Sequence, residues 1–188
     1  MAMARAPPPK GQPMVAKRTR GLVIVYTGDG KGKTTAALGM ALRAVGHGLR
    51  VAFVQFVKVE ETGERQAAAR LGPALAIFAM GRGFVTGEPG PEHRAAAARA
   101  LGLVRQCLEG GQYDVVVADE VLAAAQLRLV SREEVESLLP DRPAEVHLVL
   151  TGRGAWPSLI QRADLVTEMR ALKHPYDEGV AAQEGVEF

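Results

Sequence analysis

The sequence predicts an α/β fold of three layers, in which a mostly parallel sheet of about six strands carries helices on both faces. Two observations carry this prediction. Short apolar runs rich in β-branched residues alternate along the chain with longer segments rich in Ala and Leu. The apolar runs are continuous, as expected for strands that are buried on both faces. Parallel strands joined by right-handed helical crossovers account for both observations.

Six apolar runs predict the strands. In chain order they are GLVIVYT, RVAFVQFVK, ALAIFAM, YDVVVADE, EVHLVLTG and DLVTEMR, which occupy residues 21–27, 50–58, 74–80, 113–120, 145–152 and 164–170. Val, Ile and aromatic residues favour strands of this kind. Ligands of such sheets bind beyond the carboxyl ends of the strands, so the informative loops should be the following five: residues 28–33, 57–62, 80–90, 119–122 and 151–155.

Helical segments separate these strands. They are predicted over residues 33–48, 64–72, 91–109 and 156–163, with a further helix that starts after Ser131. The first ends at two glycines, Gly46 and Gly48, and Pro91 opens the third as a good first-turn residue. Ser131 and Glu134 have the spacing of a capping box. Helices of this number cover both faces of the predicted sheet.

The composition bounds the class of protein. A chain of 188 residues with 47% hydrophobic and 23% charged residues is typical of one soluble globular domain. No apolar run approaches the roughly 20 residues that span a bilayer, and residues 1–20 lack the apolar core of a secretory signal. The single Cys107 fits a reducing compartment and a buried position in its helix. We therefore expect a cytoplasmic protein without a membrane partner.

The formal net charge of +2 is unevenly distributed. Residues 1–20 contain five Lys and Arg residues and no acid, so the remainder of the chain is mildly acidic. This first segment is Pro-rich and lacks apolar periodicity, which predicts a flexible basic tail ahead of a single domain over residues 21–188. A mildly acidic folded part argues against a nucleic-acid partner.

A glycine-rich loop, TGDGKGKTT at residues 27–35, follows the first strand and opens the first helix. The strict phosphate-loop pattern, G-x-x-x-x-G-K followed by Ser or Thr, would require a glycine where Thr27 stands. Gly28, Gly30 and Gly32 nevertheless let the backbone turn its N–H groups inward, next to a helix N-terminus of partial positive charge. We therefore expect phosphate binding and a P-loop NTPase fold of the RecA-like type, rather than a glycine-rich turn that binds nothing.

The nucleotide-binding residues follow from this loop. Lys33 would bridge phosphate oxygens, the Thr34 hydroxyl would ligate Mg²⁺, and Lys31 adds a second cation. Arg153, in the TGR sequence after the fifth strand, could reach the phosphates. The complete predicted set is Gly28, Asp29, Gly30, Lys31, Gly32, Lys33, Thr34, Thr35 and Arg153.

Two adjacent acids end the fourth predicted strand. Asp119 and Glu120 follow four apolar residues, and a Mg²⁺–phosphate site needs a carboxylate at the end of a neighbouring strand. Adjacent strand residues face opposite ways, so one of the two is expected to face the metal, and the spacing leaves open which one. With Thr34 they form the predicted metal set; Mn²⁺ is the alternative ion.

These motifs together resemble the P-loop ATP:corrinoid adenosyltransferases of cobalamin biosynthesis. The resemblance extends from Arg20 to Phe188 and rests on the loop segment together with VQFVK, MGRGF, ADE, LTGRGA, ADLVTEMR and the ending KHPYDEGVAAQEGVEF. The phosphate loops of that family are similar, with Asn or Asp after the first glycine and GKGKTT at the end, so Thr27 is no departure.

The resemblance implies a reaction between ATP and a reduced corrinoid, such as cob(I)alamin or cob(I)yrinic acid a,c-diamide. Co(I) attacks the 5′ carbon of ATP, a Co–C bond forms and triphosphate leaves. ATP is then held reversed relative to ordinary P-loop hydrolases, with its γ-phosphate deepest. The implied catalytic residues are Lys33, Thr34, Glu120 and Phe84, the last of which would lie at the corrinoid and keep the lower axial ligand away from cobalt.

The same resemblance implies a homodimer and leaves room for a flavin-type reductase as electron donor. One departure concerns the corrinoid side: the family commonly has GEGFTW where this chain has GRGFVT, so Arg82 and Thr86 replace an acid and a Trp. Two other functions fit the phosphate loop alone. They are a RecA-like P-loop kinase or ATPase, and a nucleotide-binding module without enzymatic activity.

Overall fold

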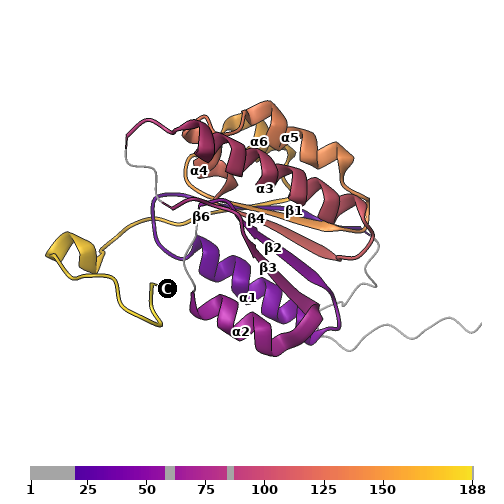
Figure 1. Cartoon of the computed structure of the whole chain (residues 1–188), viewed down its shortest axis with the longest axis horizontal. Helices are drawn as coiled ribbons and strands as arrows, with labels where there is room; N and C mark the ends of the chain where they lie inside the picture. Colours follow the sequence, from indigo (N-terminus) through magenta and orange to yellow (C-terminus); the bar gives the residue numbers. More distant parts are fainter. Residues whose placement is uncertain (1–19, 58–61, 84–86, 188) are drawn as a thin grey trace, which may run out of the picture.

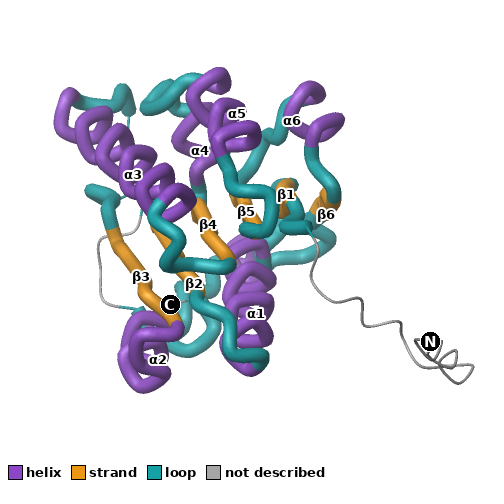
Figure 2. The backbone as a smooth tube through the Cα atoms, turned by 90° about the vertical axis from the view of Figure 1, so that its right-hand side faces the viewer, coloured by secondary structure: helices purple, strands orange, loops and turns teal. Residues whose placement is uncertain are grey.

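A six-stranded parallel sheet forms the middle layer of the computed structural model, which describes residues 20–57, 62–83 and 87–187. Its strands are β1 (Val23–Thr27), β2 (Val51–Gln55), β3 (Leu75–Ala79), β4 (Val115–Asp119), β5 (His147–Thr151) and β6 (Leu165–Glu168). Their order across the sheet is β3-β2-β4-β5-β1-β6, which Figure 2 shows from one edge to the other. The strand that leads into the glycine-rich loop, β1, therefore lies between β5 and β6.

Helices cover both faces of the sheet (Figure 1). One face carries α1 (Lys33–Gly46) and α2 (Gly63–Leu71), and the other carries α3 (Pro91–Glu109), α4 (Val121–Gln126), α5 (Arg132–Asp141) and α6 (Pro157–Arg162). Two short 3-10 helices complete the described chain, at Gly72–Ala74 and Pro175–Glu178. None of the helices in the described part of the chain combines the length and the hydropathy of a membrane-spanning segment.

The core is divided by the sheet into two apolar clusters. Side chains of consecutive strand residues alternate between them. Val25 and Val116 pack with α3 to α6, whereas Ile24 and Val117 pack with α1 and α2. Cys107 belongs to the first cluster, and burial raises the pKa of its thiol. Burial on both faces explains why the strands are continuously apolar.

The predicted elements are confirmed, with shorter strand ends, the two 3-10 helices and one additional α-helix. Pro91 begins α3, and the capping box of α5 forms through Ser131 Oγ and Glu134 in both directions, at 3.0 and 2.7 Å. The addition is α4, which begins directly after Glu120, where we expected a loop. Its sequence, VLAAAQ, consists largely of good helix formers. Four predicted features lie outside the described residues: residues 1–19 of the tail predicted over residues 1–20, Lys58 of the second predicted strand, Phe84 and Thr86.

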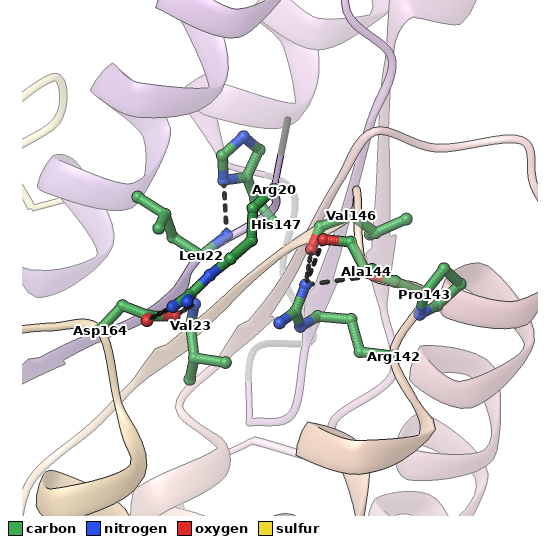
Figure 3. A network of polar contacts seen from close by, with 9 residues as sticks. All are labelled: Arg20, Leu22, Val23, Arg142, Pro143, Ala144, Val146, His147 and Asp164. Carbon is green, nitrogen blue, oxygen red and sulfur yellow. Dashed lines mark hydrogen bonds and ion pairs between the residues drawn. The ribbon is translucent and has the colours of Figure 1, made fainter. Parts of the chain in front are cut away.

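A polar network fixes the amino end of β1 (Figure 3). Asp164, which precedes β6, accepts hydrogen bonds from the Val23 N–H at 2.8 Å and from the Arg20 guanidinium. His147, the first residue of β5, accepts one from the Leu22 N–H at 3.1 Å through Nδ1. Both neighbours of β1 therefore hold its start, which sets the position of the loop at its other end.

Candidate functional site

A crevice opens at the carboxyl edge of the sheet, where the chain leaves the strands in opposite directions. The helix after β1 lies on one face, whereas the helices after β4 and β5 lie on the other (Figure 1). Such divergence is the usual origin of ligand sites in open α/β sheets. A cavity of about 760 Å³ lies here, lined among others by Gly30, Lys33, Thr34, Glu120, Thr151 and Arg153.

The glycine-rich loop packs backbone to backbone on the chain that follows β6. The Gly30 N–H donates to the Met169 carbonyl at 2.8 Å. A Cβ atom on Gly28 would lie 2.3 Å from that carbonyl oxygen, and Gly28 has a φ of 98°, in the left-handed region that favours glycine. A Cβ on Gly30 would lie 2.7 Å from the Arg170 carbonyl. Both glycines are therefore required by this close approach.

Thr27 stands where the strict pattern has glycine, and its side chain has a structural contact. The Thr27 hydroxyl accepts a hydrogen bond from the Ala155 N–H at 3.2 Å, and the Thr27 carbonyl accepts one from the Met169 N–H at 2.8 Å. Thr27 thus ties the phosphate-loop strand to the loop after β5 and to the end of β6. This explains why a side chain is accommodated at this position.

Lys33 is the first residue of α1 and lies inside the loop. Its ammonium donates to the carbonyls of Gly28 and Gly30 at 2.7 and 2.6 Å. Burial lowers the pKa of Lys33, and the charge of Arg153 lowers it further, whereas the carboxylates of Asp29, Glu120 and Asp119 raise it. A cation held at a helix N-terminus with a second cation nearby favours an anion such as phosphate.

Hydroxyl groups connect the loop to the end of β4. Thr34 Oγ1 and Thr151 Oγ1 both donate to Asp119 Oδ1, at 2.9 and 2.7 Å, and Asp119 is fully buried. Thr151 Oγ1 in turn accepts from the Glu120 N–H at 2.8 Å. Glu120 has a φ of 63°, which is unusual for a residue other than glycine and typical of functional sites. The two acids therefore differ in environment. Asp119 is buried and accepts hydrogen bonds from Thr34 and Thr151, whereas Glu120 lines the cavity.

The oxygen atoms at this point fit a hard divalent cation. Within the described part of the chain, no group of three or more His, Cys, Asp or Glu side chains could hold a metal by itself. Mg²⁺ in phosphate sites, however, takes one or two protein oxygens and completes its shell with phosphate and water oxygens. Thr34 and Asp119 provide such oxygens beside the phosphate loop.

Two polar residues at the end of β2 and the start of α2 were missed by the sequence reasoning. Gln55 is fully buried, pairs in register with Asp119, and donates through Nε2 to Glu64 Oε1 at 3.3 Å. Glu64 lines the same cavity as Lys33. The signal was available, because a glutamine in the apolar run RVAFVQFVK falls at the carboxyl end of a strand.

All the predicted nucleotide-binding residues line this cavity except Gly28, whose carbonyl accepts a hydrogen bond from Lys33. Arg153 lines the cavity from the loop after β5. The carboxyl-terminal segment also reaches it, through His174, Gly185, Val186 and Glu187. Nothing in the sequence alone places that segment here.

The parallel sheet, the strand–loop–helix unit whose loop carries GKGKTT, and the acid on a nearby strand define a P-loop α/β protein. The family of this chain can be stated more narrowly. The family model "ATP:corrinoid adenosyltransferase BtuR/CobO/CobP" matches residues 19–188, and the chain belongs to this family.

Curated relatives agree with this assignment. A corrinoid adenosyltransferase of Pseudomonas aeruginosa is 40% identical over 176 residues, which are 92% of this chain and 86% of that protein. One from Escherichia coli K12 is 38% identical, and the corrinoid adenosyltransferase CobA of Salmonella typhimurium is 39% identical; each comparison covers 92% of this chain and 88% of the relative. A solved structure, that of the flagellar accessory protein FlaH from Methanocaldococcus jannaschii, is similar at a TM-score of 0.46 and 13% identity, over 79% of this chain and 71% of that one.

Proposed function

We propose that this protein is a transferase that moves the 5′-deoxyadenosyl group of ATP to the Co(I) centre of a reduced corrinoid and releases triphosphate. The observation that carries the proposal is the family match over residues 19–188, which includes the phosphate loop and the two acids at the end of β4. The cavity beside Lys33, Thr34 and Arg153 supports it. The substrates are ATP and the corrinoid.

In this reaction the nucleophile belongs to the substrate. Co(I) gives its electron pair to C5′ and becomes Co(III), a Co–C bond forms, and the C5′–O bond breaks with its electron pair on triphosphate. The protein therefore needs neither a side-chain nucleophile nor a general base. Its task is to stabilise the charge that collects on the leaving triphosphate, for which loop N–H groups, Lys33 and Arg153 are suited. In the proposed orientation the γ-phosphate is deepest in the loop and C5′ faces the corrinoid.

Thr34 and Asp119 are our candidates for the site of Mg²⁺, with Mn²⁺ as an alternative, because their oxygens meet at 2.9 Å beside the loop. Bound there, the cation would neutralise triphosphate charge. Asp119 accepts two hydroxyl hydrogen bonds that hold its carboxylate in place. Glu120 lines the cavity, and its negative charge raises the pKa of Lys33. We therefore propose that Glu120 helps to keep the Lys33 ammonium protonated.

Other parts of the proposal rest on the family alone. They are a homodimer, a flavin-type reductase that supplies Co(I), and a position of Phe84 at the corrinoid face of the site. The proposed cytoplasmic location rests instead on the composition of the chain. The flexible tail over residues 1–20 and the single domain over residues 21–188 also remain proposals; the family match begins at residue 19.

One assay tests the reaction against its alternatives. The protein is incubated with Mg-ATP and chemically reduced cobalamin, and the products are separated. Adenosylcobalamin with inorganic triphosphate is expected; ADP with phosphate would instead identify a kinase or ATPase, and binding without turnover would identify a nucleotide-binding module. Lys33→Ala should abolish turnover, whereas Lys173→Ala, which alters an exposed lysine paired with Glu178, should leave it unchanged.

A further inference from the structure

The carboxyl-terminal segment returns to the phosphate loop. After the 3-10 helix at Pro175–Glu178, the chain comes back to the cavity, which His174, Gly185, Val186 and Glu187 help to line. Figure 1 shows the end of this segment beside α1. The segment is thus part of the wall of the candidate nucleotide site.

An ion pair joins this segment to the loop. The Lys31 ammonium donates to Glu187 Oε2 at 2.5 Å, although the two residues are 156 positions apart. The side chains remain 39% and 25% exposed. The hydrogen bond from Lys31, followed by the charges of Lys31 and His174, lowers the pKa of the Glu187 carboxyl, so it is an anion at neutral pH.

The two loop lysines differ in what they hold. Lys33 donates to carbonyl groups of the loop itself, whereas Lys31 donates to a carboxylate from a remote segment. A carboxylate oxygen offers an ammonium group the same charge and the same acceptor as a phosphate oxygen does. A polyphosphate that engages Lys31 must therefore replace Glu187 or share the ammonium with it.

We propose that Glu187 is an internal anion that competes with the polyphosphate for Lys31 and so weakens polyphosphate binding and speeds the release of triphosphate. Glu187 acts through Lys31 and is a positioning residue. The proposal rests on the proposed function, since it requires that the loop binds the polyphosphate chain. Replacing Glu187 by a phosphate group at Lys31 costs little free energy, because a partly exposed ion pair contributes little to stability in water.

The experiment measures binding of inorganic triphosphate and of Mg-ATP by titration calorimetry at low salt. Glu187→Gln should bind both about two- to fivefold more tightly than the native protein, as expected for loss of a competing exposed ion pair. Glu187→Asp should restore native affinity. Glu184→Gln is the matched control, because Glu184 is an exposed acid of the same segment and does not line the cavity.

Two further measurements separate competition from a structural role. The gain in Glu187→Gln should shrink between about 0.05 and 0.5 M salt, because exposed charges are screened. In a Lys31→Met background, Glu187→Gln should produce no gain. Single-turnover experiments should show slower triphosphate release from Glu187→Gln.

The outcomes that overturn the inference are distinct from those that overturn the function. Weaker binding by Glu187→Gln would show that the carboxylate supports Lys31 as a ligand, and unchanged affinity at low salt would show that it plays no part. Either result, with normal adenosyl transfer by the native protein, overturns only the role of Glu187. Failure of the native protein to bind triphosphate and Mg-ATP would overturn the inference and the proposed function together.

Discussion

Single charged side chains set the electrostatics of the phosphate loop, and Lys33 donates to two carbonyl groups of that loop. Burial and the nearby Arg153 lower the pKa of its ammonium, and three carboxylates only partly offset this. A triphosphate beside Lys33 adds several negative charges, which favour the charged form and raise the pKa. Binding of the nucleotide is therefore coupled to the protonation of Lys33.

The coupling predicts how affinity depends on pH. Because the pKa of Lys33 is lower in the free protein than in the complex, affinity should be constant below the free-protein pKa. It should then fall as the pH rises through that value and towards the ordinary lysine range, with proton uptake on binding. Calorimetric titration of Mg-ATP in buffers of different ionisation enthalpy checks this between about pH 7 and pH 10.

Lys33→Arg provides the control, since arginine stays charged throughout this range. Its affinity, even if reduced, should not fall with pH in the same way. Equal pH profiles for the native protein and Lys33→Arg would contradict the assignment to Lys33.

Individual site residues could be predicted from the sequence where a local pattern marks them. Lys33 and Thr34 follow from the loop pattern, and Asp119 follows from its place at the carboxyl end of an apolar strand. Glu187 could not be found in this way, because its contact with Lys31 depends on the path of a segment without strands or long helices. Which acid approaches Thr34 depended on the backbone turn at Glu120.

Among the elements, α5 and α6 are joined by one carboxylate. Glu136 on α5 accepts hydrogen bonds from Trp156 Nε1 at 2.6 Å, Ser158 Oγ at 2.5 Å and Arg162 Nη1 at 2.7 Å. The hydrogen bonds from Ser158 and Trp156 are the main reason that the pKa of Glu136 is lowered. This connection holds α6 and the start of β6 against the rest of that face.

Glu136→Gln should destabilise the fold by about 1–2 kcal/mol at pH 7, since hydrogen bonds to a charged group are lost. The folded-state pKa is depressed, so the contribution is complete above the unfolded pKa of about 4.3 and is lost as the pH falls through the folded value. Urea unfolding of both proteins at pH 7 and near pH 3 measures this. Glu133→Gln, at an exposed position of the same helix, is the control and should change stability little. A difference that persists unchanged at low pH would contradict the role of the charge.

The helix α4 could not be predicted from the sequence. Its six residues are too few to show a helical period, and they follow a strand without a capping side chain. The capping box of α5 could be predicted because its two partners are three residues apart.

At the scale of the whole molecule, the candidate site is assembled at the carboxyl ends of three strands that are distant in the chain, β1, β4 and β5. Alternation of apolar runs and helices was sufficient to predict a parallel three-layer fold. The order β3-β2-β4-β5-β1-β6 was not predicted, because it depends on which crossovers turn towards which edge, and single-chain patterns carry little of that information.

Since the site draws on β1, β4 and β5, a bound ligand should stabilise the fold as a whole. At Mg-ATP concentrations about 100 times Kd, the expected gain is about 2.7 kcal/mol, and at about 2–4 °C per kcal/mol for a chain of this size the Tm should rise by about 5–10 °C. Thermal unfolding followed by circular dichroism measures the change. Mg²⁺ alone should give no comparable rise, and a rise of equal size in Lys33→Ala would mean that the ligand binds elsewhere.

Glu120 adopts a left-handed backbone conformation that glycine would adopt with less strain, and its N–H is bound by the hydroxyl of Thr151. A population of variants selected only for thermal resistance would therefore be drawn towards glycine at this position. That substitution removes the Glu120 carboxylate, which lines the cavity directly after β4. Selection for heat tolerance alone would thus remove a side chain that we propose contributes to the charge of the nucleotide site.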